Sequence, residues 1–284
     1  MKRLALSLVL LLAPLSASAQ AAGEDPNGPR PIAMRPTVWI DEMTWMELRD
    51  AVQMGKTTAI IPTGGTEPNG PFSVEGKHSF IVRSDAEAIA ERLGNALIAP
   101  VIWFEPGGDP APATLPAGEL PGQFAIRTTV YKDVLKDVAS SLRQFGFKDI
   151  ILFGDNGGNQ TPMSQVATEL NQAWGAANAA RAHHIPEYYA QHGVIDDLLP
   201  SWGINQGDGG VHDSYRVTAT LMALDVNYVR LEERIAAGKT EINGISIVPV
   251  INVIEHARRM QEMKTIATVQ AIRKATAVRA TEQR

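Results

Sequence analysis

The residues best suited to chemistry are concentrated first in the stretch 60–78, which reads IIPTGGTEPNGPFSVEGKH. It carries a carboxylate, an amide and an imidazole, at Glu67, Asn69 and His78, among glycines and prolines that turn the chain. Carboxylates and imidazoles transfer protons and bind divalent ions. A buried strand is predicted at 58–61, and ligands of α/β proteins bind at loops that leave the carboxyl ends of strands. These side chains are therefore expected to point into a site.

A second stretch of the same character covers 150–160 and reads IILFGDNGGNQ. Its apolar half predicts another buried strand, and Asp155 and Asn156 follow directly after that strand. Gly157 and Gly158 allow backbone N–H groups to approach an oxyanion closely. We interpret the two stretches as facing walls of one site.

Composition excludes several classes of protein. The chain has 284 residues, 44% of them hydrophobic, which is enough for a full-sized core. The formal net charge is -5, without a basic run, so no nucleic-acid partner is expected. Cysteine is absent, which excludes disulfides, thiolate metal sites and cysteine nucleophiles.

The first residues have the three-part form of a secretory signal. Lys2 and Arg3 precede an apolar run at 4–15, and small residues follow up to Ala19. The run is short for a membrane span and suits cleavage after Ala19, with an uncleaved anchor as the alternative. The sequence thus predicts a signal peptide over 1–19, a periplasmic or secreted protein, no membrane contact after cleavage, and a flexible lead-in at 20–36.

Strand-like and helix-like patterns alternate from residue 37 onward. The expected strands are 58–61, 96–102, 149–153 and 181–185. The expected helices are 45–54, 84–93, 128–146, 160–173 and 251–280. A capping box, Thr44 with Glu47, supports the first helix, and Ser84-Asp85 is expected to cap the second. Such alternation predicts βαβ units and a mostly parallel sheet in one domain over 37–284, with 103–121 as a long functional or contact loop.

Four glycine-rich motifs, in order, resemble those of the creatininase (creatinine amidohydrolase) family. They are TGGTEPNGP at 63–71, LPG at 120–122, GDNGGN at 154–159 and GVH at 210–212. The corresponding family patterns are G-S-T-E-x-H-G-P with a later G-T-D, then F-P-G-T, N-G-H-G-G-N and H-A-G-E. The resemblance implies a three-layer α/β/α fold, a homo-oligomer, and metal-dependent hydrolysis of a small amide or cyclic amide.

The resemblance also implies roles for particular residues. In the family, the Glu of T-E-x-H, the His two residues on, the Asp of G-T-D and the His of N-G-H bind two ions, and the His of H-A-G donates a proton. The matching positions here are Glu67, Asn69, His78, Asn156 and His212, of which Glu67 and His212 keep the family's residue.

These departures change the predicted site. A neutral imidazole offers a metal one lone pair, so His78 cannot bridge two ions as an aspartate does, and amides are weak ligands. The sequence predicts a single zinc, manganese or iron ion held by Glu67 and His78, with Asp155 or His212 completing the site. His212 and Asp155 are the expected catalytic residues. Contacts to the substrate or oxyanion are expected from Asn69, Asn156, Gly157 and Gly158.

Other interpretations of the same residues stay open. Glu67 and His78 would also suit a polar loop, and Asp213 or His212 a helix cap. Adjacent strand residues face opposite sides, so at most one of His183 and His184 can enter a site. Beside the metal-dependent amidohydrolase stand a degenerate family member acting as a binding or assembly protein, and a metal-free hydrolase that uses Asp155 and His212.

Overall fold

The computed structural model describes residues 25–107, 119–175, 180–204 and 212–282, with side chains up to 277. The chain divides into two units, 1–33 and 34–284. In the first unit, the described part contains a turn in which Gly28 N–H donates to the Asp25 carbonyl. The predicted signal peptide lies outside the described residues. None of the helices in the described ranges is long and apolar enough to cross a membrane.

A four-stranded parallel sheet forms the centre of the second unit. Its order is β2-β1-β5-β6, and every neighbouring pair is parallel. The strands are β1 (Thr58–Thr63), β2 (Ala96–Ile98), β5 (Asp149–Gly154) and β6 (Arg181–His184). All residues of β1 and β5 are buried, which agrees with their continuous apolar runs.

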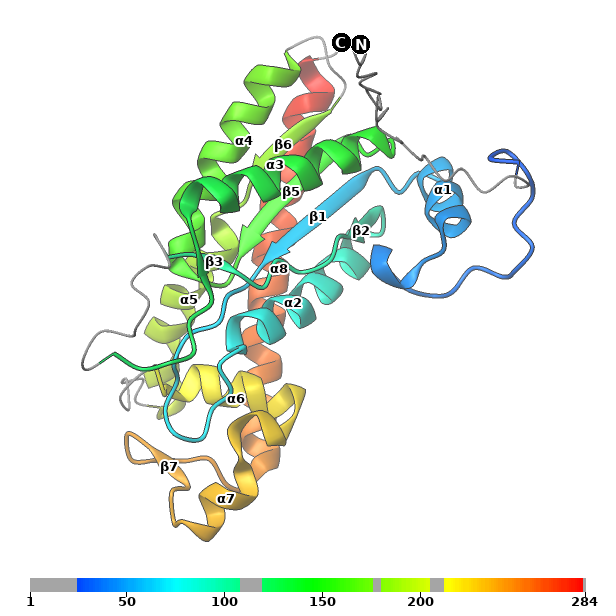
Figure 1. Cartoon of the computed structure of the whole chain (residues 1–284). Coiled ribbons are helices and arrows are strands. Elements are labelled where there is room, and N and C mark those ends of the chain that lie inside the picture. Colours follow the sequence, from blue (N-terminus) through cyan, green and yellow to red (C-terminus); the bar gives the residue numbers. More distant parts are fainter. Residues whose placement is uncertain (1–24, 108–118, 176–179, 205–211, 283–284) are drawn as a thin grey trace, which may run out of the picture. The chain divides into compact units, whose positions relative to one another are not determined.

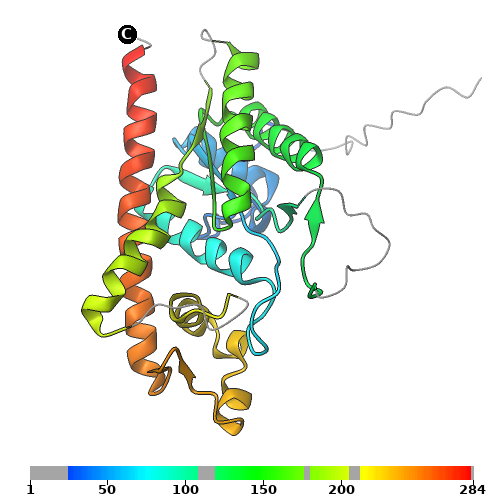
Figure 2. The ribbon, with the colours of Figure 1, turned by 90° about the vertical axis from the view of Figure 1, so that its left-hand side faces the viewer.

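Helices cover both faces of this sheet. One face packs on α3 (Thr128–Gln144), α4 (Gln160–Trp174) and part of α1 (Trp45–Gln53). The other face packs on α2 (Lys77–Leu93), α5 (Glu187–Leu198) and α8 (Val250–Glu282). Figure 1 shows α3 in front of the strands and α8 behind them, and Figure 2 shows α4 and α8 on opposite sides. The fold is thus the expected three-layer α/β/α arrangement.

A smaller helical cluster adjoins the layers at one end of α8. It contains α6 (Tyr215–Leu224), α7 (Leu231–Ala236) and a hairpin of β7 (Glu241–Ile242) and β8 (Ile245–Ser246). Its apolar core takes Val253, Ala257 and Met260 from the first half of α8, whereas Val269 and Ile272 from the second half join the core under the sheet. One helix therefore belongs to both cores (Figure 2).

Most expected elements are present, two expectations are corrected, and one helix is additional. The Thr44–Glu47 capping box forms as predicted. Helix α2 begins at Lys77 and not at Ser84, so His78 lies in a helix and Asp85 is a buried helical residue. Strand β2 ends at Ile98, followed by one isolated bridge from Ile102 to Thr63. Helix α5 was not predicted. Short strands β3 (Glu105–Pro106) and β4 (Ala125–Ile126) flank residues 108–118, which lie outside the described ranges.

The order of the strands places the two glycine-rich loops together. From β1 the chain passes through α2 to β2 on one side, and from β5 it passes through α4 to β6 on the other. Strands β1 and β5 are neighbours whose last residues, Thr63 and Gly154, pair with each other. A parallel sheet binds ligands at such a reversal of strand order, beyond the carboxyl ends of the strands.

Candidate active site

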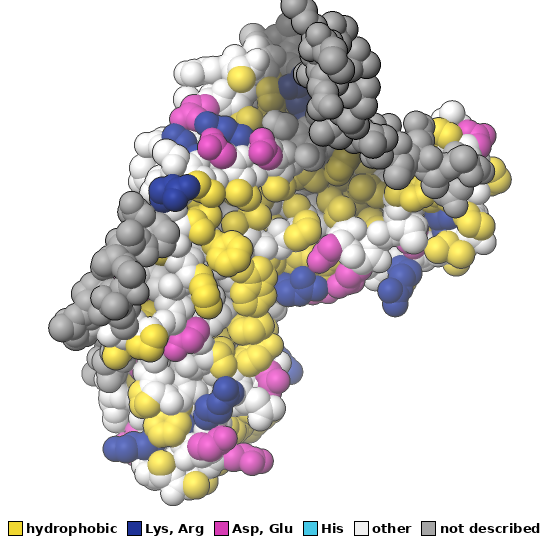
Figure 3. Space-filling view, viewed as in Figure 1, with side chains coloured by type: hydrophobic (Ala, Val, Ile, Leu, Met, Phe, Trp, Pro, Cys, Tyr) yellow, Lys and Arg dark blue, Asp and Glu magenta, His cyan; other side chains and the backbone are white. Residues whose placement is uncertain are grey.

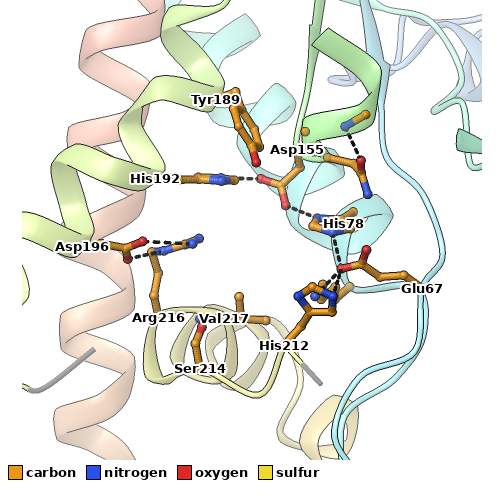
Figure 4. A pocket seen from close by; sticks show the side chains of 14 residues that line it. Glu67, His78, Asp155, Tyr189, His192, Asp196, His212, Ser214, Arg216 and Val217 are labelled. Carbon is orange, nitrogen blue, oxygen red and sulfur yellow. Dashed lines mark hydrogen bonds and ion pairs between the residues drawn. The ribbon is translucent and has the colours of Figure 1, made fainter. Parts of the chain in front are cut away.

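A cavity of about 520 Å³ lies at this reversal point. The loop after β1 supplies Glu67, the first turn of α2 supplies His78, and the loop after β5 supplies Asp155. Helix α5 and the segment that begins α6 form the opposite wall (Figure 4). The remaining lining residues are Lys77, Asn156, Gly157, Gly158, Tyr189, His192, Asp196, His212, Ser214, Arg216 and Val217. The two loops therefore line one site, as predicted, but they leave the same edge of the sheet and form one wall, so the prediction that they face each other is wrong.

His78 connects the two carboxylates of the site. Its Nδ1 lies 2.8 Å from Asp155 Oδ2, and its Nε2 lies 2.9 Å from Glu67 Oε1. Carboxylates only accept hydrogen bonds, so both ring nitrogens must donate and the ring is an imidazolium. Burial alone would lower the pKa of His78, but the hydrogen bonds to Asp155 and Glu67 outweigh it and raise that pKa.

Glu67 has a second cationic neighbour. Lys77 Nζ lies 2.6 Å from Glu67 Oε1, and the lysine side chain is 3% exposed. Burial would raise the pKa of Glu67, yet the hydrogen bond and charge of His78 and the charge of Lys77 lower it to about 2. Glu67 is therefore ionised at neutral pH and is a weak base.

Asp155 is the most enclosed carboxylate of the site. Its Oδ1 accepts from His192 Nε2 at 2.9 Å and lies 3.4 Å from Lys264 Nζ, which comes from α8. The Tyr188 hydroxyl, which donates its one proton to Asp85 Oδ2 at 2.7 Å, also lies 3.2 Å from Asp155 Oδ1. Burial would raise the pKa of Asp155, but the charge of Lys264 and the hydrogen bonds from His192 and His78 hold it well below its usual range.

His192 is the basic group of this arrangement. Burial lowers its pKa, and the charge of Lys264 adds to this, so the ring is neutral at pH 7 even beside Asp155. A neutral ring that donates from Nε2 to Asp155 carries its lone pair on Nδ1. The ring of Tyr189 lies 4.8 Å from that of His192 and lines the cavity beside it.

His212 lies across the cavity from α5. Its Nε2 is 3.9 Å from Glu67 Oε1, and its side chain is 58% exposed. Its φ of 57° belongs to the left-handed region, which only a few non-glycine residues adopt. The cap of α6 is Ser214, not His212 or Asp213, because the Ser214 side chain accepts from Val217 N–H. Asp213 instead pairs with the buried Arg234 at 2.9 Å.

Three of the residues expected to contact substrate are engaged within the protein. Asn69 does not line the cavity, and its amide donates to the Glu67 and Val74 carbonyls. Asn156 donates to Glu105 Oε2 at 2.6 Å and accepts from Gly158 N–H at 2.7 Å. The Gly158 N–H is thus used by a turn and does not point at an oxyanion. Gly157 and Asn156 still line the cavity.

Several site residues were absent from the sequence prediction. They are Lys77, Tyr189, His192, Arg216 and Lys264. Arg216 pairs with Asp196 at 2.6 Å on the wall opposite the loops (Figure 4). A signal existed for Lys264, because it lies on the same helical face as the apolar Ala257 and Met260, where a lysine needs a buried partner. The histidine pair 183–184 stays out of the cavity, bonded to Asp149 and Gln160.

Comparison with known proteins identifies the family. The sequence model of the creatininase family, described as creatinine amidohydrolase, matches residues 41–282. The chain belongs to the creatininase family. A creatininase mutant complexed with creatine has a TM-score of 0.60 and 18% identity, with 87% of this chain and 99% of that chain covered. A creatininase mutant of Zn–Zn type has a TM-score of 0.57 and 18% identity, with 85% and 97% covered.

One curated relative matches a shorter stretch. It is the 3-dehydro-scyllo-inosose hydrolase of Thermotoga maritima, which is 30% identical over 124 residues. The match covers 43% of this chain and 37% of that relative. The creatininase structures, at this level of identity, establish the fold alone.

The donor atoms of this site do not fit the pair of ions that a Zn–Zn creatininase holds. Within the described ranges, no group of three or more His, Asp or Glu side chains is arranged to hold an ion. Both ring nitrogens of His78 are engaged, and Lys77 already neutralises Glu67. A divalent ion ~4 Å from an ammonium is repelled by about 8 kcal/mol at an effective dielectric constant of ~20. An ion bound by Glu67 and His78 would have to displace the Lys77 ammonium group and the proton on His78 Nε2.

Proposed function

We propose that this chain hydrolyses the C–N bond of a small amide or cyclic amide. Its membership of the creatininase family supports this class of reaction. The observation that carries the proposal is the pair formed by Asp155 and His192, in which a carboxylate holds a neutral imidazole at the wall of the cavity. Such a pair is a general base that functions at neutral pH.

The proposed reaction uses the protein's own side chains. His192 Nδ1 takes a proton from water as the water oxygen bonds to the carbonyl carbon. The His78 imidazolium lies within the same cavity and offsets the negative charge that develops on the carbonyl oxygen. The C–N bond then breaks, and His212, which is more exposed than the other imidazoles, gives a proton to the departing nitrogen.

The size and polarity of the cavity limit the substrate. About 520 Å³ accommodates a small molecule, and the walls carry both acidic and basic side chains. A compact, polar, ring-shaped amide suits these walls. The Thermotoga relative is named for a cyclic ketone substrate, so hydrolytic opening of cyclic ketones belongs in the same screen.

The test is a turnover screen over lactams, cyclic ureides, formamides and cyclic polyhydroxy ketones. It is run with the untreated protein, after dialysis against EDTA, and with added Zn²⁺ or Mn²⁺. Activity lost in His192→Gln, and in His212→Gln for amides with poor leaving groups, supports the proposal. Activity that depends on an added ion returns the assignment to the metal-dependent reaction predicted from the sequence.

A binding function is the second candidate, and one observation favours it. Four of the five family site positions are altered in identity or in partner. Asn69, His78 and Asn156 replace family ligands, and Glu67, although retained, is paired with Lys77. A ligand that raises the melting temperature without being converted by any variant would support this function.

Export and assembly are also proposed. The amino-terminal signal pattern supports a periplasmic or secreted protein, which cell fractionation with an antibody to the mature chain would test. A homo-oligomer is supported by the apolar side chains that gather on the face seen in Figure 3. A groove of about 380 Å³ is lined by Trp45, Leu48, Val52 and Phe145, and Phe145 is half exposed. Light scattering on the purified protein measures the mass that decides this.

A further inference from the structure

Each carboxylate at the floor of the site has its own buried ammonium group. Glu67 is paired with Lys77, and Asp155 with Lys264. Both lysine side chains are almost completely buried, at 3% and 7% exposure. Lysines are rarely found at such positions unless they neutralise an acid.

Lys77 is fixed by its place in the fold. It is the first residue of α2, directly before His78, so the helix presents an ammonium and an imidazolium to the same oxygen. Glu67 Oε1 lies 2.6 Å from the lysine nitrogen and 2.9 Å from the histidine nitrogen. Two cationic donors on one carboxylate oxygen occupy the directions from which a metal ion would approach it.

Lys264 makes the equivalent contacts from the opposite side of the fold. Its Nζ lies 3.0 Å from Asp85 Oδ2, 3.4 Å from Asp155 Oδ1 and 3.3 Å from His192 Nε2. It also lies 4.8 Å from the centre of the Tyr188 ring. The ammonium group therefore connects α8 with α2, α5 and the loop after β5.

Every carboxylate of this buried cluster already has an ammonium neighbour. Lys77 Nζ contacts Glu67, and Lys264 Nζ contacts Asp85 and Asp155. A divalent ion placed beside these carboxylates without displacing a lysine would be repelled by an ammonium group and would add positive charge out of water.

We infer that the ammonium groups of Lys77 and Lys264 stand in place of the divalent ions of a Zn–Zn creatininase site, and that this chain is a metal-independent member of its family. His78 completes the substitution, because it joins the two carboxylates that a shared ion would otherwise join. The inference concerns what holds the site together and does not rest on the proposed reaction.

The first experiment uses the wild-type protein, purified without chelator. Elemental analysis is expected to find zinc, manganese and iron far below one ion per chain. The melting temperature is expected to stay the same in EDTA and in excess Zn²⁺ or Mn²⁺. About one or two ions per chain, or a melting temperature that EDTA lowers, would overturn the inference whether or not a substrate is known.

The second experiment exchanges the ammonium group. Lys77→Gln leaves Glu67 and His78 exposed to an ion, and its melting temperature is expected to fall and then to rise by ~5 °C or more with Mn²⁺ or Zn²⁺ at about 100 times the dissociation constant. Lys148→Gln is the matched control, since Lys148 is exposed and precedes the opposite end of β5. A Lys77→Gln variant as stable as this control, or one that ions do not restabilise, would contradict the inference.

Neither experiment needs turnover. A failed substrate screen with a metal-free, chelator-resistant protein refutes the proposed hydrolysis and leaves the inference intact. Turnover that requires a bound ion supports hydrolysis but refutes the inference that the two lysines replace the ions.

Discussion

The replacement Glu67→Gln tests the electrostatics of the site most directly. Glutamine keeps the shape of the side chain but removes the charge that pairs with Lys77 and His78. The pKa of Glu67 falls from 4.5 to about 2 in the folded protein. A shift of this size corresponds to about 3.4 kcal/mol of stability at pH 7. Because the side chain is 17% exposed, solvent screening reduces the expected loss to about 2 kcal/mol.

The sign of the pH dependence follows from the direction of the shift. A carboxylate whose folded-state pKa is lowered contributes its full stabilisation above its unfolded pKa and loses it as the pH falls towards 2. At pH 3, about two-fifths of the contribution is left, so the difference between wild type and Glu67→Gln is expected to shrink from about 2 to about 0.8 kcal/mol.

Urea unfolding followed by tryptophan fluorescence, at pH 7 and at pH 3, measures both quantities. Glu255→Gln is the control, because Glu255 pairs with Arg259 on the exposed side of α8 and is expected to contribute about 0.3–0.5 kcal/mol. A Glu67→Gln loss that is equal at both pH values, or larger at pH 3, would refute the assignment of Glu67 as a carboxylate stabilised by Lys77 and His78.

Three further predictions follow from other contacts. For an identified substrate, kcat/KM is expected to fall as the pH drops through the lowered pKa of His192, with a midpoint below 6.5. The variant His192→Gln should lose this acidic limb of the pH profile and be slower by a factor of about 10²–10⁴. A midpoint above 6.5 would contradict the role of His192 as base. Arg234→Met breaks the buried pair with Asp213 and is expected to cost about 3–5 kcal/mol in urea unfolding, so an unchanged stability would argue against this pair. Gly64→Ala places a Cβ 2.5 Å from the Ser79 Cα in α2 and is expected to lower the free energy of unfolding by ~1–3 kcal/mol. Gly193 is the control, because nothing lies within 4 Å of its added Cβ, and alanine there should be neutral or stabilising by about 1 kcal/mol. Equal effects at both sites would count against the close approach of Gly64 to α2.

The sequence predicted the sheet and the meeting of its two loops because both depend on local patterns. Continuous apolar runs mark 58–61 and 149–153 as buried strands, and glycine and proline end each of them. Once the strands are parallel and adjacent, Glu67 and Asp155 have to leave from the same edge. The short capping signal at Thr44 was sufficient for the same reason, since both of its partners lie within one turn.

The start of α2 was missed because distant residues decide it. Ser84 and Asp85 have the composition of a helix cap, but Asp85 is held inside the helix by Lys264 and by the Tyr188 hydroxyl at 2.7 Å. Those partners come from α8 and α5, more than 100 positions along the chain. A local pattern contains no information about such a partner, so the tertiary contact overrides it.

His192 was missed for a related reason. Helix α5 carries both buried and exposed residues without a clean apolar stripe, and its charged residues gave no periodic signal. Its function as a wall of the cavity depends on Asp155, which is contributed by the loop after β5. Residue types alone placed acid and base chemistry in this chain, and only the fold shows which acid holds which base.

The double membership of α8 has a consequence for the order in which the molecule is completed. Every strand of the parallel sheet precedes α8 in the chain, so all four are synthesised before Lys264 is available. Until that helix docks, Asp155 and Asp85 lack the ammonium group that contacts both of them and neutralises their negative charge. The carboxyl ends of the strands, where the site lies, would therefore stay incompletely packed in the nascent chain, and the site would be completed only when α8 docks in the final step of folding.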